Sequence, residues 1–225
     1  MLELGITHED LDFMSLMGDV NRRRLLEGSA RVVYPAGAIA FHPEAPILVA
    51  LLERGLVRAY CSVPDGRQAT VAFIHAKELI GGAAVIKRPT WFLQAVIEST
   101  VTTLEVERVR NLSGTEVQVV AAIATQLAQR VRNAFRLISV RSLGNIRERL
   151  AYDLLDRACR GQLASGRLET RATHADLADS IGSSREVVSR ALGGLRGEGI
   201  VETAPGVVRV VEPMRLAAIV RAFVI

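Results

Sequence analysis

The sequence predicts an α+β protein with a β-rich N-terminal part, one long helix and a C-terminal part of short helices and a hairpin. Short runs of β-branched residues recur between residues 31 and 109, whereas residues 115–140 contain neither Gly nor Pro. The charge also divides: residues 1–129 carry 12 Lys and Arg against 14 Asp and Glu (net −2), and residues 130–225 carry 16 against 10 (net +6). A basic C-terminal part behind a mildly acidic one fits a nucleic-acid-binding module joined to another domain.

The β-rich part is preceded by two short flanking helices, expected around residues 9–17 and 20–29. Turn residues separate the runs that follow, and Asp65-Gly66 is a strong hairpin signal because both residues tolerate positive φ. Strands of this length at roughly ten-residue spacing are typical of a sandwich or barrel. The candidate strands are residues 47–52, 56–60, 70–74, 92–97 and 101–106.

Residues 115–140 predict a single long helix, and its apolar residues follow alternating steps of three and four, as in a coiled-coil seam. The seam consists of Val117, Val120, Ala124, Leu127, Val131, Ala134 and Ile138. Ile123, Phe135 and Leu137 lie off the seam, so one face can pack on the chain's own β domain while the seam meets a twin helix. We therefore expect a parallel homodimer; a helix packed only within its own chain is the alternative.

The C-terminal part begins with an amphipathic helix over residues 146–160 and a polar connector over residues 161–171. Thr173 then begins a further helix, with Asp176 three positions later as a helix-start carboxylate, and Gly182 ends it.

A second helix follows, with Ser183 as its expected N-cap and Glu186 at the capping-box position. Gly197 to Gly199 ends this helix, and two short strands over residues 200–202 and 207–211 come next. Helix, tight turn, helix and hairpin form a winged helix-turn-helix.

The second helix leaves four side chains on its exposed side: Arg185, Glu186, Ser189 and Arg190. Arginine can donate two hydrogen bonds to guanine O6 and N7, and glutamate can accept one from cytosine N4. The sequence therefore predicts a DNA-reading helix. In the alternative, Glu186 only caps the helix and the arginines are only solvated.

These residues resemble a known family. The stretches 173–178 and 182–192 are similar to the DNA-binding signature of the cyclic-AMP receptor protein/FNR (CRP/FNR) family of bacterial transcription regulators. Residues 34–37, 55–58 and 65–67 resemble, in order, turns of that family's β-roll. The resemblance implies a double-stranded β-helix of the cyclic-nucleotide-binding type over residues 1–110, a dimerisation helix over 111–145 and a winged helix-turn-helix domain over 146–225.

The resemblance also implies contacts with double-stranded DNA and with RNA polymerase. Arg185, Glu186 and Arg190 would contact bases, in half-sites of the TGTGA type read twice by a dimer on an inverted repeat. The positions implied near phosphates are Thr173, His174 and Ser184.

The family's cyclic-nucleotide site uses a Gly-Glu pair for the ribose and an Arg-Ser pair for the phosphate. The corresponding residues here are Gly81-Gly82 and Trp91-Phe92, and the family's hydroxyl positions on the long helix fall at Ala134 and Phe135. A buried phosphate without its arginine is costly. We therefore expect an effector other than cyclic AMP, or none.

The aromatic side chains Trp91, Phe92 and Phe135 would suit an apolar or aromatic small molecule, or would simply fill the core. Arg88 lies close by in the sequence, so a cyclic-nucleotide-responsive regulator with an atypical pocket is the alternative.

Other classes of protein are disfavoured. Cys61 and Cys159 are the only cysteines, too few for a four-cysteine cluster, so we expect neither metal nor cofactor. Haem bound through His42 or His75 is the alternative to structural histidines. The absence of GxSxG, P-loop and HExxH motifs argues against an enzyme. No signal peptide or membrane-length apolar run is present, which predicts a cytoplasmic protein with no membrane partner.

Overall fold

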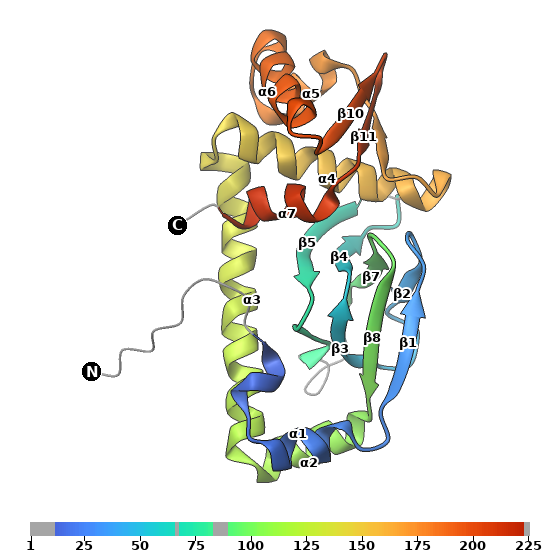
Figure 1. Cartoon of the computed structure of the whole chain (residues 1–225), viewed down its shortest axis with the longest axis vertical. Coiled ribbons are helices and arrows are strands. Elements are labelled where there is room, and N and C mark those ends of the chain that lie inside the picture. Colours follow the sequence, from blue (N-terminus) through green and yellow to red (C-terminus); the bar gives the residue numbers. More distant parts are fainter. Residues whose placement is uncertain (1–11, 66–67, 83–89, 223–225) are drawn as a thin grey trace, which may run out of the picture.

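The computed structural model describes residues 12–65, 68–82 and 90–222, and it confirms the α+β fold (Figure 1). The N-terminal domain consists of two four-stranded antiparallel sheets. One sheet has the order β1 (Ala30–Tyr34), β8 (Ser99–Leu104), β3 (Val49–Arg54) and β6 (Leu79–Ile80); the other has the order β2 (Ile39–Phe41), β7 (Phe92–Ala95), β4 (Leu56–Ser62) and β5 (Gln68–His75).

A shared core joins the two sheets. Leu52 and Val101 of the first sheet pack in one buried cluster with Val57 and Leu93 of the second. This is the two-layer arrangement expected of a β-roll, because each sheet buries the apolar face that its alternating residues create. All five candidate strands are confirmed within a few residues, and β1, β2 and β6 are additional.

The helices around this domain differ in part from the expectation. The first flanking helix is a 3₁₀ turn, η1 (Phe13–Leu16), and the second is α1 (Asp19–Leu26). Residues 9–11 lie outside the described residues, as do Gly66, Arg67 and Arg88. The β4–β5 pairing nevertheless reaches Ser62 and Gln68, which agrees with the predicted hairpin.

The long helix is α3 (Val117–Leu143), and a separate helix, α2 (Val106–Thr115), precedes it. The last predicted strand was extended to residue 106, and this was wrong. β8 ends at Leu104, and Val106 is the first residue of α2. Extended backbone at Glu116, with φ −115° and ψ 106°, separates the two helices. Among the described residues, no helix combines the length and apolarity needed to cross a bilayer.

The C-terminal domain contains α4 (Ile146–Ser165), α5 (His174–Ile181) and α6 (Arg185–Gly197), followed by the hairpin β10 (Val201–Ala204) and β11 (Val207–Val210). Within the predicted connector, α4 continues to Ser165 and β9 (Glu169–Arg171) adds a third strand beside β11. A final helix, α7 (Pro213–Arg221), was not expected. It packs mainly against α4, with Leu216, Ala217 and Val220 buried.

The two domains share one apolar cluster. Leu56, Phe73 and Val96 of the sheets pack in the same cluster as Leu154 and Leu155 of α4. In Figure 1, α4 lies across the end of the β domain, and α5 and α6 lie beyond it. The β domain thus supports α4, which in turn carries the two helices of the predicted DNA-reading unit.

Candidate nucleic-acid interface and sensor region

The turn between α5 and α6 follows from local capping. Thr173 caps α5 in a complete capping box with Asp176, and Gly182 ends α5 in the left-handed conformation at φ 62°. Both features confirm the sequence-based assignment. The N-cap of α6 is Ser184 rather than Ser183, and its Oγ accepts a hydrogen bond from the Val187 amide at 3.4 Å.

The three predicted base-reading side chains are all exposed at the start of α6. Val188, Leu192 and Leu195 are buried on the opposite side of the helix, which leaves Arg185, Glu186 and Arg190 facing solvent. Their positions within the first two turns suit a helix that enters the major groove by its N-terminal end.

The charges of this group are in the forms that base reading requires. Glu186 is not at the capping-box position, since that residue is Val187. Hydrogen bonds from its own backbone amide and from Ser184, helped by Arg185 and Arg190, lower the pKa of Glu186. The ionised carboxylate can therefore accept from a base. Among the described residues neither arginine forms a salt bridge, so both guanidinium groups keep their donors available.

The predicted phosphate-contacting residues lie at two helix N-termini. Thr173 and His174 stand at the start of α5, and Ser184 precedes α6. Helix N-termini attract anions because their amide groups have no partner within the helix. The Thr173 hydroxyl is already bonded to Asp176, and the Thr173 backbone and hydroxyl together lower the pKa of Asp176.

One face of α3 presents an apolar stripe to solvent, and the 27 residues of the helix carry it over several turns. We define the α3 stripe as Val117, Val120, Ala121, Ala124, Ala128, Val131, Phe135 and Ile138. All eight are exposed; Phe135 is 60% and Ile138 is 65% accessible. Alternating steps of three and four are kept along it.

Two members of the predicted seam do not lie on the α3 stripe, and three residues outside the seam, Ala121 among them, do. Leu127 is half-buried against the N-terminal core, and Ala134 is half-buried as well, whereas Ala128 and Phe135 take the adjacent exposed positions. The reason is the docking of α3 on its own domain. Gln126 accepts a hydrogen bond from the Leu79 amide at 3.2 Å and so fixes the rotation of the helix.

The predicted effector residues do not form one pocket within a chain. Phe135 lies on the exposed α3 stripe, so within a single chain it is not buried with Trp91 and Phe92, and its place in an effector pocket stays a prediction. Phe92 stacks on Tyr60, with 5.2 Å between ring centroids, and Trp91 packs against the core between the sheets.

Gly81 and Gly82 follow β6. The backbone conformation explains why residue 81 is a glycine. Gly81 has φ +76°, and a Cβ there would lie 2.0 Å from the Leu48 carbonyl oxygen. A Cβ at Gly82 would meet only the flexible end of Leu79, at 3.1 Å. Close backbone packing therefore requires the first glycine whether or not a ligand binds.

We expect Gly81→Ala to destabilise the protein strongly and Gly82→Ala to have a much smaller effect. Strained backbone alone costs about 1–3 kcal/mol, and displacement of the β3 backbone adds to it. Thermal unfolding measures both variants; the melting temperature falls by roughly 2–4 °C per kcal/mol in a chain of this size. Equal melting temperatures for the two variants would contradict this reading of Gly81.

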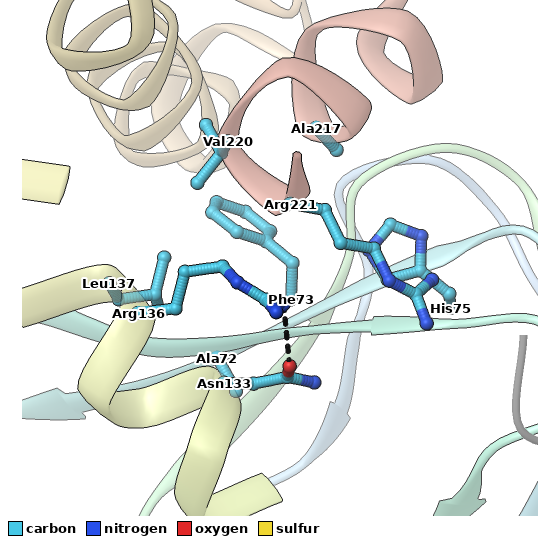
Figure 2. Close-up of a pocket in the computed structure, with 9 residues that line it drawn as sticks. All are labelled: Ala72, Phe73, His75, Asn133, Arg136, Leu137, Ala217, Val220 and Arg221. Carbon is cyan, nitrogen blue, oxygen red and sulfur yellow. Dashed lines mark hydrogen bonds between the residues drawn. The ribbon is translucent and has the colours of Figure 1, made fainter. Parts of the chain in front are cut away.

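A small cavity lies where β5, α3 and α7 meet (Figure 2). Its volume is about 30 Å³, enough for a water molecule but far below the roughly 300–1,000 Å³ of small-molecule pockets. The side chains that line it are Ala72, Phe73, His75, Asn133, Arg136, Leu137, Ala217, Val220 and Arg221.

Apolar side chains line most of the cavity, and the guanidinium groups of Arg136 and Arg221 add positive charge. Arg136 donates to the Asn133 Oδ1 at 3.0 Å, and burial together with the charges of Arg132 and Arg221 lowers the pKa of Arg136. His75 therefore shares its surroundings with the guanidinium groups of Arg136 and Arg221.

Comparisons with known proteins agree on one family. A model described as a Crp-like helix-turn-helix domain matches residues 148–219. The chain is 31% identical to the Cyclic AMP receptor protein of Thermus thermophilus over 192 residues, which are 84% of this chain and 87% of that protein. It is 31% identical to the Transcriptional regulator LdrP of the same species, over 68% of this chain and 77% of LdrP.

Solved structures show the same fold. A transcriptional regulator of the Crp/Fnr family from Eubacterium rectale superposes with a TM-score of 0.59 at 18% identity, covering 94% of this chain and 99% of that chain. The likeness therefore includes the β domain, the long helix and the C-terminal domain together.

Proposed function

Since this chain belongs to the CRP/FNR family of transcription regulators, we propose that it acts as a homodimer that reads an inverted repeat of TGTGA-like half-sites. The observation that carries the proposal is the exposed set Arg185, Glu186 and Arg190 on the first two turns of α6. Their spacing matches the family's base-reading residues. Arginine on guanine and glutamate on cytosine are the pairings that such a half-site offers.

The α3 stripe supports the dimer. A row of exposed apolar side chains about six helical turns long is unusual on a monomer surface, and a second copy of the helix would bury it by knobs-into-holes packing. Two-fold symmetry then places two α6 helices for two half-sites about one helical turn of DNA apart.

Fluorescence anisotropy with labelled duplexes tests the DNA specificity. We expect the protein to bind an inverted TGTGA repeat with an affinity at least about 10³-fold higher than that for a scrambled duplex at physiological salt. A duplex with one scrambled half-site should bind with intermediate affinity. Equal affinities for all three duplexes would refute specific reading.

We also propose that the regulator works without cyclic AMP. By the family resemblance, Gly82 stands where the cyclic-nucleotide site has its carboxylate. Phe135 faces outward, and the tail helix α7 lines the small cavity beside α3. Cyclic AMP should leave both the anisotropy curve and the melting temperature unchanged. A ligand that binds only the folded state raises its stability by about 2.7 kcal/mol at one hundred times its Kd, so a rise in melting temperature would contradict the proposal.

A further inference from the structure

A buried ion pair joins the β domain to the C-terminal domain. The Arg58 side chain of β4 is completely buried, and its guanidinium reaches the Asp156 carboxylate of α4 at 3.2 Å. Asp156 also accepts a hydrogen bond from the Thr70 hydroxyl of β5, and its second oxygen pairs with Arg160 of α4 at 2.8 Å. Two strands of one domain are thus bonded to a single carboxylate of the other.

The rest of the Arg58 guanidinium is bonded inside the β domain. Its Nε donates to the Thr70 hydroxyl at 2.7 Å and its NH1 donates to Gln68 at 3.0 Å, while the Tyr60 ring lies 4.4 Å from it. These contacts fix the direction of the group. Asp156 is the charged partner of Arg58 among these contacts, since the others are neutral, and it shares its single negative charge with Arg160.

Further hydrogen bonds cross the same interface. The Gln94 amide of β7 donates to the Cys159 carbonyl at 2.9 Å, and the Gln162 amide of α4 donates to the Val96 carbonyl at 2.9 Å. Gln94 is fully buried and Gln162 is 3% exposed. Buried polar groups such as these favour one well-satisfied arrangement, because a displaced donor or acceptor would lose its partner while still buried.

We propose that the Arg58–Asp156 pair is an interdomain lock, which holds α4 on the sheets in a DNA-reading arrangement. In the locked arrangement α5 and α6 lie at the end of the molecule away from the β domain (Figure 1), and the base-reading side chains are exposed. The DNA-reading part of this inference rests on the proposed function; the locking part does not.

The test compares Asp156→Asn with Asp153→Asn in the full-length protein. Asp153 lies about one turn earlier on α4 and is buried to a similar degree, and its bonds to Arg157 and Ser180 both stay within its own domain. Hydrogen-exchange mass spectrometry reports the lock directly. Asp156→Asn should raise exchange in both β5 and α4 by about tenfold, the scale of coupling between sites, whereas Asp153→Asn should leave β5 unchanged.

DNA affinity gives the second readout. Asp156→Asn should weaken binding to the inverted repeat by about tenfold, because an unlocked domain must be ordered again on binding. Tighter binding would overturn the proposed DNA-reading arrangement, and unchanged β5 exchange would overturn the lock. If the wild type fails to bind the repeat, the proposed function fails while the exchange result still decides the lock.

Gln162→Ala keeps the proposal testable if Asp156→Asn does not fold. This variant removes a neutral crossing bond and leaves the ion pair in place. We expect Gln162→Ala to raise hydrogen exchange in β5, by less than Asp156→Asn does, and to leave the circular dichroism spectrum unchanged. A folded Gln162→Ala protein with wild-type exchange in both β5 and α4 would overturn a cooperative interdomain lock.

Discussion

Ile138→Glu is expected to convert the dimer into monomers and to weaken binding to the inverted repeat by about 10²–10⁴-fold, because the second half-site then no longer binds in the same complex. Ile138 is 65% exposed in a single chain, so its replacement removes little burial from the monomer. Against a partner helix, however, the new carboxylate would be buried in the apolar stripe, which is costly.

Sedimentation velocity measures this prediction directly, with anisotropy on the same samples. Val33→Glu is the matched control: Val33 is 56% exposed on β1, outside the α3 stripe. That variant should sediment and bind as the wild type does. A dimeric Ile138→Glu protein would show that the α3 stripe is not the dimer interface.

Arg185→Ala is expected to lower affinity for the intact repeat by about 1–3 kcal/mol per half-site, with little effect on binding to a scrambled duplex. The side chain is exposed and bonded to no other described residue, so stability should not change. Arg190→Ala should behave in the same way at another base pair, since the two guanidinium groups lie more than one turn apart.

Arg196→Ala is the control for charge. It removes the same positive charge from the last turn of the same helix, where Arg196 donates to the Thr203 hydroxyl at 3.4 Å. We expect this variant to weaken intact and scrambled duplexes by the same small factor. If Arg185→Ala also weakens both duplexes equally, Arg185 contacts the backbone rather than a base.

Much of the DNA-reading unit was predictable because its signals are local. The Thr173–Asp176 capping box, the left-handed Gly182 and the buried stripe of α6 each depend on residues within a few positions of one another. The predicted N-cap of α6, Ser183, was wrong by one residue. Two adjacent serines are equally good caps until the exact start of the helix is known. The tail helix α7 was missed because it is short and its apolar face is buried only by packing against α4.

The sensor region was less predictable because its residues are brought together by packing. Arg58 lies in a predicted strand and in a turn motif of the family, and nothing near it in the sequence indicates Asp156, 98 positions away. Phe135 matched an effector position by alignment, yet the way α3 docks on the N-terminal core turns its ring outward.

By itself the sequence determined the order of the elements, the family and the chemistry offered by α6, because capping, periodicity and side-chain type act over one or two turns of chain. Only the tertiary structure decided which face of α3 stays exposed, which helix lines the space beside it and which carboxylate pairs with Arg58. Those outcomes depend on the rotation and docking of whole elements, where small differences in burial between competing faces decide the arrangement.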